Sequence, residues 1–264
     1  MDDLWTQHEC RQGQVYACAA AQLRLWLMRN PQGWLVAARH EAESRFEPLR
    51  EAASAPEALE WQRFVTPSSS SRMCIRPALP DRPVMSRPEA HIEIAPKHKG
   101  LFFVTIPVWL RLELVADVAH SAIALCEFPT RVLSKTWFGH PAEDGSIGYA
   151  LTTRARQGLD ELNDVAGRAI CPVLVDNGTA SPLVFSQLLL SVRHMGLYAT
   201  GDGRLWTNQY RMGYKGSYCP ADLTFGHAAP EQAAGARLVA DPREAPTSGL
   251  AARTIAGAIF RQPF

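Results

Sequence analysis

The feature that most constrains this chain is a series of short segments, apolar or alternating, that follow one another from residue 91 onward. Turn-forming sequences separate several of them, at residues 142–145, 176–178 and 201–203. Runs of this length bounded by Gly, Asn and Asp are typical of β-strands, and a long series of them is typical of an antiparallel sandwich or barrel. The segments are residues 91–95, 101–106, 110–115, 122–128, 131–135, 147–153, 169–176, 183–193 and 204–213. We therefore predict a mainly β fold, an antiparallel β-sandwich-like architecture with few short helices.

The N-terminal part predicts a β-hairpin followed by a less regular stretch. In residues 23–28 leucines alternate with other side chains, so they share one face of a strand. A turn signal at residues 30–33 and a second strand at residues 34–38 complete the hairpin. Residues 39–60 are rich in Glu, Ala and Arg and contain two prolines, which predicts a short helix or a loose connection.

A serine-rich stretch at residues 67–71 is the clearest candidate for a linker. It predicts an N-terminal hairpin and helical or loop segment over residues 1–66, and a main antiparallel β domain over residues 72–264. One continuous domain is the alternative. Residues 156–165 and 250–260 are the remaining segments with a helical pattern.

Charge and hydropathy argue against two classes of partner. The 27 basic and 26 acidic residues give a formal net charge of +1, so no electrostatic footprint for nucleic acid is evident. No stretch approaches the roughly 18 apolar residues of a membrane-spanning helix, and the first residues do not resemble a secretory signal. We expect a soluble, cytoplasmic protein with no transmembrane segment and no nucleic-acid partner.

The sequence contains no P-loop, GxSxG elbow, HExxH or EF-hand loop. The six cysteines form no CxxC pair, which argues against a zinc knuckle, and we expect them to be reduced and mostly buried. The eight histidines are scattered, and no two are spaced to share a strand face as metal ligands. We predict no catalytic residues, no cofactor and no metal site, and we favour a non-enzymatic role.

The most unusual stretch, residues 134–156, contains the candidate ligand-binding residues Trp137, His140, Arg154 and Arg156. A histidine titrates near neutrality and an arginine grips anions, so these four side chains predict a small polar pocket. The other interpretation is an ordinary hairpin in which the tryptophan packs in the core and the arginines face water.

A second aromatic and basic group lies in the segment RLWTNQYRM. Trp206 and Tyr210 are four residues apart, which would place them on one strand face beside Arg211. Such a face is typical of single-stranded nucleic-acid binding, although packing in a sheet core explains it equally well.

Four segments follow one another in a recognisable order: a proline-rich IRPALPDRPV, an apolar strand running into FVTIPVWLRLEL, a turn–strand unit TWFGHPAEDGSIGYALTTRAR, and CPVLVDNGTASPLVFSQLLLSVRHMGLY with its Asn-centred turn. In this order of elements residues 75–212 resemble a prokaryotic family, domain-of-unknown-function family 432. The resemblance brings no established activity, cofactor or catalytic residue. Some members are encoded near small-conductance mechanosensitive channels, which implies an accessory role beside a membrane channel.

These patterns favour a non-enzymatic binding or interaction module whose partner is a membrane channel or another protein. The alternative is an enzyme or small-anion binder with a site around Trp137, His140, Arg154 and Arg156. A single-stranded nucleic-acid binder is the third hypothesis, and the balanced charge speaks against it. The oligomeric state stays open.

Overall fold

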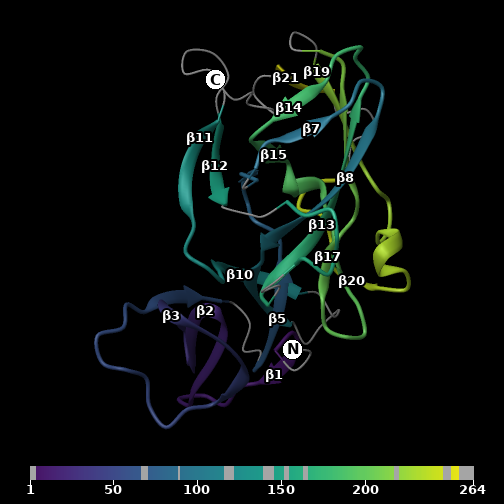
Figure 1. Cartoon of the computed structure of the whole chain (residues 1–264). Helices are drawn as coiled ribbons and strands as arrows, with labels where there is room; N and C mark the ends of the chain where they lie inside the picture. Colours follow the sequence, from purple (N-terminus) through teal and green to yellow (C-terminus); the bar gives the residue numbers. More distant parts are fainter. Residues whose placement is uncertain are drawn as a thin grey trace. The chain divides into compact units, whose positions relative to one another are not determined.

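A computed structural model describes residues 4–66, 71–88, 90–115, 122–138, 146–151, 155–162, 166–216, 220–245 and 251–255 (Figure 1). Strands dominate these residues, and the two helices among them are short 3-10 turns, η1 (Val192–His194) and η2 (Glu231–Ala233). The prediction of a mainly β, antiparallel fold with few short helices is confirmed, and the described strands form multiple antiparallel sheets.

The chain forms two compact units, and it passes between them more than once. Unit 1 comprises Met1–Ala78 and Pro107–Val132, and unit 2 comprises Leu79–Ile106 and Leu133–Phe264. This division differs from the predicted boundary at residues 67–71, because a later stretch of chain returns to complete a sheet of unit 1.

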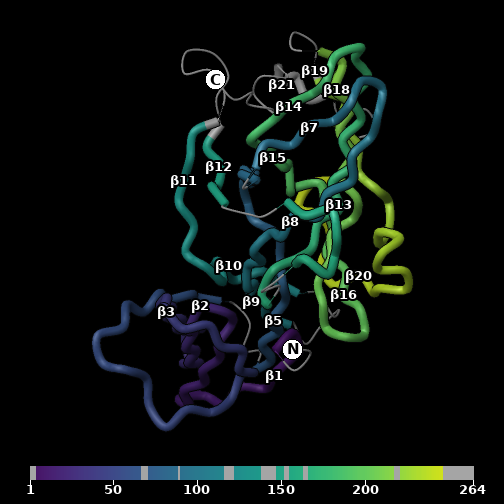
Figure 2. Tube along the Cα trace, in the orientation of Figure 1, coloured from purple at the N-terminus to yellow at the C-terminus, as the bar shows by residue number. Residues whose placement is uncertain are grey.

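Unit 1 contains two antiparallel sheets. One has the strand order β2 (Val15–Asn30), β3 (Gly33–Glu51), β4 (Gln62–Val65). The other has the order β1 (Gln7–Glu9), β5 (Arg72–Ala78), β9 (Trp109–Val115), β10 (Ala122–Pro129). In the trace of Figure 2, the teal strands β9 and β10 lie beside the blue strand β5.

The predicted N-terminal hairpin is present as β2 and β3. Asn30 pairs with Gly33, and Leu23, Leu25 and Leu27 are fully buried on one face of β2. Gly33 has a φ of +144°, and a Cβ there would collide with the carbonyl oxygen of Phe64 on β4. The turn therefore requires glycine at this position.

The two sheets of unit 1 share one apolar core, as in a β-sandwich. The buried face of β2 contributes its leucines, and the alternating residues Leu110, Leu112 and Leu114 of β9 join the same cluster. Met73 and Ile75 add the inner face of β5. The period-two pattern of these strands thus gives the sheets their buried sides.

The prediction of a helix or loose connection over residues 39–60 is wrong for most of that stretch, because β3 continues to Glu51. Its pairing with β2 slips where Arg45 pairs with Ala21 and His40 pairs with Leu23, which leaves the intervening residues outside the ladder. The buried Arg24 side chain donates a hydrogen bond to the Glu43 carbonyl within this bulge. Pairing with β2 therefore overrides the helical preference of the Glu- and Arg-rich sequence.

Arg24 makes three hydrogen bonds at this bulge. Its Nη1 donates to the carbonyl oxygens of Ala21 at 2.8 Å and Leu23 at 3.1 Å, and its Nη2 donates to that of Glu43 at 2.7 Å. Its Nε lies 3.1 Å from a carboxylate oxygen of Glu41. A hydrogen bond from Arg39, with the nearby arginine charges, keeps the pKa of Glu41 below its usual value.

The described residues of unit 2 form three sheets. The first has the order β11 (Ser134–Phe138), β12 (Ser146–Leu151), β6 (Val84–Ser86), β15 (Leu188–Leu190). The second has the order β20 (Arg237–Ala240), β16 (Leu197–Ala199), β17 (Leu205–Thr207), β13 (Arg168–Asn177), β18 (Tyr210–Tyr214), β19 (Pro220–Phe225), β21 (Ala251–Ile255), with β8 (Lys99–Pro107) also paired to β13. The third joins β14 (Leu183–Phe185) to β7 (Ile92–Ile94).

Unit 2 also contains parallel strand pairs, which the antiparallel prediction did not include. β13 runs parallel to both β17 and β18, and β12 runs parallel to β6. These strands are far apart in sequence or separated by crossing connections, so local turn signals do not report their direction.

The two predicted helical segments of unit 2 are not helical in the residues that the structure describes. Arg156 forms an isolated bridge with Phe103, in which its N–H donates to the Phe103 carbonyl at 3.1 Å and its carbonyl accepts at 2.7 Å. Turns follow up to residue 162. Residues 251–255 of the second segment form β21, which pairs with β19. At Arg156 and in β21 backbone groups bond to another strand, and the hydrogen bond from the Leu162 N–H to the Leu159 carbonyl closes a single turn that does not continue as a helix.

Trp206 and Tyr210 belong to the core of unit 2. They lie on separate strands, β17 and β18, so the prediction that they share one strand face is wrong. Their exposed fractions are 3% and 0%, which favours the core-packing interpretation over nucleic-acid binding.

The cysteines of the described residues are free thiols, buried or half-buried, as expected. Burial raises the pKa of Cys10, Cys18, Cys126 and Cys171 to about 12. Cys219 lies outside the described residues. Within the described ranges, no helix is long and apolar enough to cross a membrane.

Candidate functional site

Of the four candidate ligand-binding residues, the structure describes two. Arg156 lines a cavity of unit 2, whereas Trp137 lies on β11, 52% exposed, and is not among the residues that line the cavity. His140 and Arg154 lie outside the described residues. The two described residues thus lie on two different surfaces, Arg156 at a cavity and Trp137 on an exposed strand pair.

The cavity, called here the Arg156 cavity, has a volume of about 370 Å³. This is within the range of about 300–1,000 Å³ typical of small-molecule sites. Its walls come from the segment around β7, from β8 and from the turn after Ala155. The lining residues are Pro88, Ala90, His91, Ile92, Glu93, Phe102, Ala155, Arg156, Gln157 and Glu161.

The floor of the Arg156 cavity is apolar and close-packed. Phe102 on β8 is only 4% exposed, and its ring meets the ring of Phe185 edge-on at 6.3 Å between centroids. A Cβ on Gly100 would lie 2.8 Å from the Phe102 ring, so the glycine makes room for this ring on the same face of β8. The bridge between Phe103 and Arg156 holds the turn that carries the polar wall.

The polar wall consists of Arg156, Gln157 and Glu161. Arg156 Nε lies 3.9 Å from Glu161 Oε2, at the outer limit of an ion pair, and the Arg156 side chain is 26% exposed. Glu161 Oε1 also accepts a hydrogen bond from the Gly158 N–H at 3.2 Å. The backbone of Arg156 is thus fixed by the bridge to Phe103, and its side chain lies at the edge of the cavity next to the carboxylate of Glu161.

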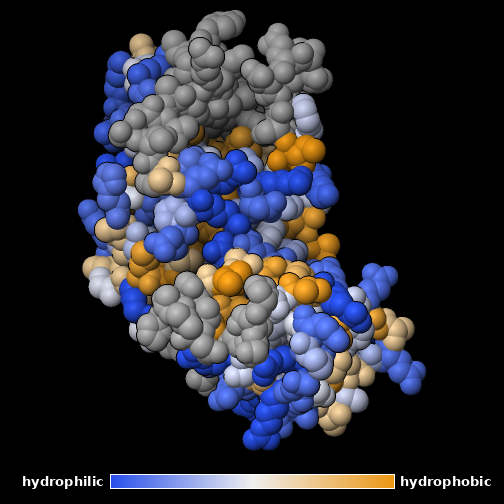
Figure 3. Space-filling view, turned by 180° about the vertical axis from the view of Figure 1, so that it is seen from behind, coloured by the Kyte–Doolittle hydropathy of each residue, from blue (hydrophilic) through white to orange (hydrophobic). Residues whose placement is uncertain are grey.

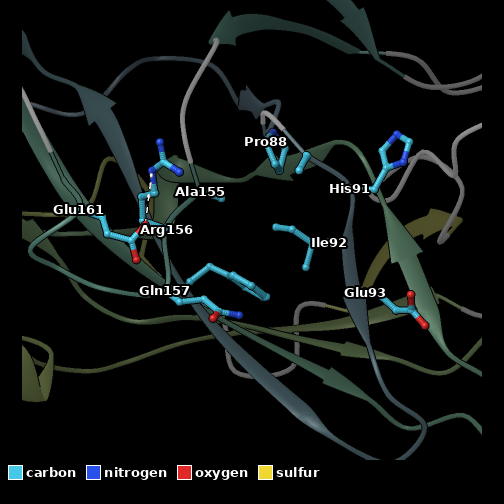
Figure 4. A pocket seen from close by; sticks show the side chains of 10 residues that line it. Pro88, His91, Ile92, Glu93, Ala155, Arg156, Gln157 and Glu161 are labelled. Carbon is cyan, nitrogen blue, oxygen red and sulfur yellow. Dashed lines mark ion pairs between the residues drawn. The ribbon is translucent and has the colours of Figure 1, made fainter.

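Figure 4 shows how these side chains are directed. Arg156 and Glu161 lie on one side of the cavity, joined by the dashed ion pair, and Ile92 points inward from the other side. Glu93 on β7 and His91, which directly precedes this strand, point away from the cavity centre, on the side opposite to Ile92. The side chains that face the cavity therefore combine an apolar body with one charged wall.

Besides Arg156, the described lining residues include three ionisable side chains, those of His91, Glu93 and Glu161. They include no Ser, Thr, Cys, Tyr or Lys that could act as a nucleophile. The ring of His91 points outward, away from the cavity. Across the described residues, no three His, Cys, Asp or Glu side chains gather into a group that could hold a metal ion.

The second surface, called here the β11–β12 face, consists of Lys135, Trp137, Ile147 and Tyr149. Trp137 pairs directly with Ile147, which is 46% exposed, and Lys135 pairs with Tyr149 two positions along the same face. In the described part of this sheet, β11 is a terminal strand (Figure 1). A half-exposed tryptophan opposite an exposed isoleucine is uncommon on a surface where, as Figure 3 shows for one side of the molecule, hydrophilic residues predominate.

β12 is anchored through its backbone and through one side chain of the β11–β12 face, that of Tyr149. The Tyr149 N–H donates to the Pro83 carbonyl at 2.9 Å, and a Cβ on Gly148 would lie 2.7 Å from that same oxygen. The Tyr149 hydroxyl donates to Asp81 Oδ1 at 2.8 Å. Burial, with the bond to Asp81 and its charge, raises the pKa of Tyr149 to about 12. The exposed Trp137–Ile147 pair thus lies on a strand pair that Tyr149 fastens to Asp81 and Pro83.

Sequence reasoning identified Arg156 but missed its cavity partners. Ile92 and Phe102 have the pattern of ordinary strand residues, and Glu161 fell within a predicted helix. They meet Arg156 through a bridge between residues 53 positions apart in sequence. The alternation of Ile92 with His91 and Glu93 was the available signal, but it does not show what the apolar face covers.

No curated protein and no solved structure matches the chain. A family model, however, matches residues 4–260, which is wider than the stretch of residues 75–212 on which the resemblance rested, and includes nearly all of the N-terminal part. The chain therefore belongs to the family described as protein of unknown function (DUF432).

Proposed function

We propose that this protein is a non-enzymatic binding module that holds a small organic ligand in the Arg156 cavity. The observation that carries the proposal is a cavity of about 370 Å³ in which Arg156 lies across from the apolar side chain of Ile92. This volume is in the range of small-molecule sites, in which a few polar groups fix the ligand's orientation.

The proposal keeps one part of the small-anion hypothesis and drops another. Of the four residues that the sequence predicts to bind a ligand, Arg156 lines the cavity, and its guanidinium is the group that would bind an anion. Among the described lining residues no nucleophile is paired with a base, so support for an enzyme is weaker than support for a binding protein. Binding of a ligand to the folded chain raises its stability by mass action.

A thermal-shift screen of the full chain against carboxylates, phosphates, amines and uncharged aromatics tests the proposal. A ligand present at about 100 times its dissociation constant adds about 2.7 kcal/mol to the free energy of unfolding. We expect at least one hit that is lost in Arg156→Ala and kept in Arg237→Ala, a matched control that removes an exposed arginine from β20, outside the cavity. A screen in which every hit survives Arg156→Ala would count against the proposal.

A second candidate function is docking of a membrane channel on the β11–β12 face. The exposed Trp137–Ile147 pair favours it, because tryptophan is the residue type most enriched among those that dominate binding energy at protein interfaces. A terminal strand also offers unpaired backbone groups to an incoming strand. The channel is the partner that the family resemblance implies, and the expected cytoplasmic location agrees with a partner whose soluble parts face the cytoplasm.

Affinity capture from gently solubilised native membranes tests docking. We expect the intact chain to retain a channel protein and the double variant Trp137→Ser, Ile147→Ser to lose it. Val65→Ser is the control, because Val65 is 77% exposed on β4 of unit 1 and lies outside this face. Equal capture by all three chains would exclude the β11–β12 face as the contact.

A further inference from the structure

We infer that Asn177 and Gly178 form a latent deamidation site, which the folded chain protects and which reacts when the loop after β13 opens. The inference goes beyond the proposed function and does not depend on it. Asn177-Gly178 is the one Asn-Gly dipeptide of the sequence, since the other asparagines precede Pro31, Asp164 and Gln209. An asparagine before glycine is especially prone to this reaction, because a residue without Cβ leaves its backbone nitrogen open to close approach.

The reaction needs only these two residues and water. The backbone nitrogen of Gly178 attacks Cγ of the Asn177 side chain and loses its proton. The new C–N bond replaces the bond from Cγ to Nδ2, ammonia leaves, and a succinimide ring forms. Water then opens the ring at either of its carbonyl groups, which leaves an aspartyl or an isoaspartyl residue in place of Asn177.

In the folded chain both reacting groups are engaged in hydrogen bonds. The Gly178 N–H donates to the Tyr214 carbonyl at 2.9 Å, so this nitrogen is not free to attack. The Asn177 side chain is fully buried, and its Oδ1 and Nδ2 atoms make hydrogen bonds of 2.7–3.1 Å to four residues, Ile94, Ala95, Thr179 and Ser181. Because Cγ carries both atoms, it cannot turn toward the Gly178 nitrogen without breaking these bonds.

The structure also explains why a labile pair occupies this position. Asn177 supplies both the donors and the acceptor that the loop uses, and a Cβ on Gly178 would lie only 3.1 Å from the Tyr214 carbonyl oxygen. Gly178 itself is exposed, so water is at hand once the loop opens. Protection therefore rests on the hydrogen bonds, and the rate of deamidation follows the fraction of time in which the loop is open.

The products fit the loop less well than asparagine does. An aspartyl residue presents a carboxylate oxygen to the carbonyl groups of Ile94, Ala95 and Ser181, where Nδ2 donates in the intact chain. An isoaspartyl residue adds a methylene group to the main chain at Asn177, the position that pairs with Tyr214 in the ladder of β13 and β18. Because the ammonia is lost to solvent, each conversion weakens the fold and is not reversed.

Deamidation rates of the full chain, folded in buffer and unfolded in urea at the same pH and temperature, test the protection. Peptide mass mapping gives the rate at each asparagine, and Asn30 is an internal control because Pro31 has no N–H to form the ring. In urea we expect Asn177 to react fastest. In the folded chain we expect its rate to be lower by about 100-fold or more, since the attack must first break about four side-chain hydrogen bonds. A native rate within about tenfold of the rate in urea would overturn the inference.

Thr179 offers variants that loosen the loop alone. Its hydroxyl lies 2.7 Å from Asn177 Oδ1 and 2.9 Å from the Ser181 carbonyl oxygen, and Thr179→Val removes it while keeping the shape of the side chain. We expect Thr179→Val to raise the native rate at Asn177 by about three- to tenfold, and Thr179→Ser, which keeps the hydroxyl, to leave it near that of the unsubstituted chain. Thr200→Val is the matched control, because it removes a hydroxyl bonded to Asp202 in another turn. An unchanged rate in Thr179→Val, or an equal rise in Thr200→Val, would contradict reaction through this loop.

Pulse proteolysis tests the effect on the fold. A sample partly converted in urea is refolded and then digested briefly at increasing urea, so that converted and unconverted chains are compared in one tube. We expect the aspartyl and isoaspartyl forms to be digested at a lower urea concentration than the unconverted chain. Equal urea midpoints would overturn the claim that conversion weakens the fold. No ligand enters these measurements, so their failure and the failure of the proposed function are distinguishable.

Discussion

Asn177 is the polar centre that fixes the chain beside the Arg156 cavity, and its replacement gives the sharpest prediction of fold stability. It ends β13 and is fully buried. Its Nδ2 donates to the carbonyl oxygens of Ile94 at 3.0 Å, Ala95 at 3.1 Å and Ser181 at 2.8 Å. Its Oδ1 accepts from the N–H of Thr179 at 3.1 Å and from its hydroxyl at 2.7 Å. One side chain thus joins the end of β7 to the loop after β13.

The magnitude follows from these contacts: the two hydrogens of Nδ2 are shared among three carbonyl acceptors, so the side chain makes about four full hydrogen bonds. A typical intramolecular hydrogen bond contributes about 1 kcal/mol net, and bonds around one side chain do not add fully because water reaches some of the partners once they are freed. Asn177→Ala should therefore lower the free energy of unfolding by about 3–4 kcal/mol. Asn177→Asp has nearly the same shape, yet it points a carboxylate oxygen at three carbonyl oxygens. At neutral pH this variant should lower the free energy of unfolding at least as much as Asn177→Ala does.

Urea denaturation followed by circular dichroism measures both variants. Asn30→Asp is the matched control, since Asn30 uses its side-chain oxygen to accept from the Gln32 N–H at 2.9 Å, and aspartate keeps that oxygen. The control should change the free energy of unfolding by less than about 0.5 kcal/mol. A value for Asn177→Asp within about 1 kcal/mol of the unsubstituted chain would refute the reasoning, because it would mean that the amide donor is not needed.

Three further results are expected. Arg24→Met, which keeps the apolar stem but removes the donors to the bulge in β2 and β3, should lower the free energy of unfolding by about 2–4 kcal/mol in urea denaturation, and a loss below about 0.5 kcal/mol would contradict it. Gly33→Ala should lower the free energy of unfolding by about 2 kcal/mol or more in the same assay and expose β4 amides to hydrogen exchange. Gly13→Ala should lower it less, because Gly13 also has a positive φ but a Cβ there would meet no neighbouring atom. Cys18 and Cys171 should resist a thiol reagent at pH 8 until the chain unfolds. Because burial raises the pKa of both thiols in the folded chain to about 12 from a reference of 9.0, the free energy of unfolding should fall as pH rises from 9 toward 12. Rapid labelling of either cysteine in the native chain, located by peptide mass mapping, would contradict the burial.

Local patterns predicted the N-terminal hairpin and failed for the strand that completes it. Leu23, Leu25 and Leu27 alternate cleanly, and the turn before Gly33 has the right residues, so local chemistry and the fold agree there. The second half of β3 has a helical composition, and only its long-range pairing with β2 and the contacts of Arg24 make it a strand. The parallel pairing of β13 with β18 could not be predicted either, because no local turn sequence joins the two strands.

The candidate site shows the same division. Arg156 was predicted from its chemistry, which a sequence displays. The cavity depends on which apolar residues face it, and Phe102 and Ile92 have the same pattern as buried strand residues elsewhere in the chain. Trp137 was expected either in a pocket or in the core, and its exposure on β11 follows from the position of that strand at the end of its sheet.

The central claim is that the Arg156 cavity is where this protein binds its ligand, and methyl NMR tests it most directly. The full chain is labelled at isoleucine δ1-methyl groups and titrated with the tightest ligand of the screen. Ile92 points into the cavity, Ile147 lies on the β11–β12 face and Ile123 lies on β10 of unit 1. The account predicts that the Ile92 resonance shifts with saturation while Ile123 and Ile147 stay in place. An unchanged Ile92 resonance at saturating ligand, or a saturable shift confined to Ile147, would contradict it.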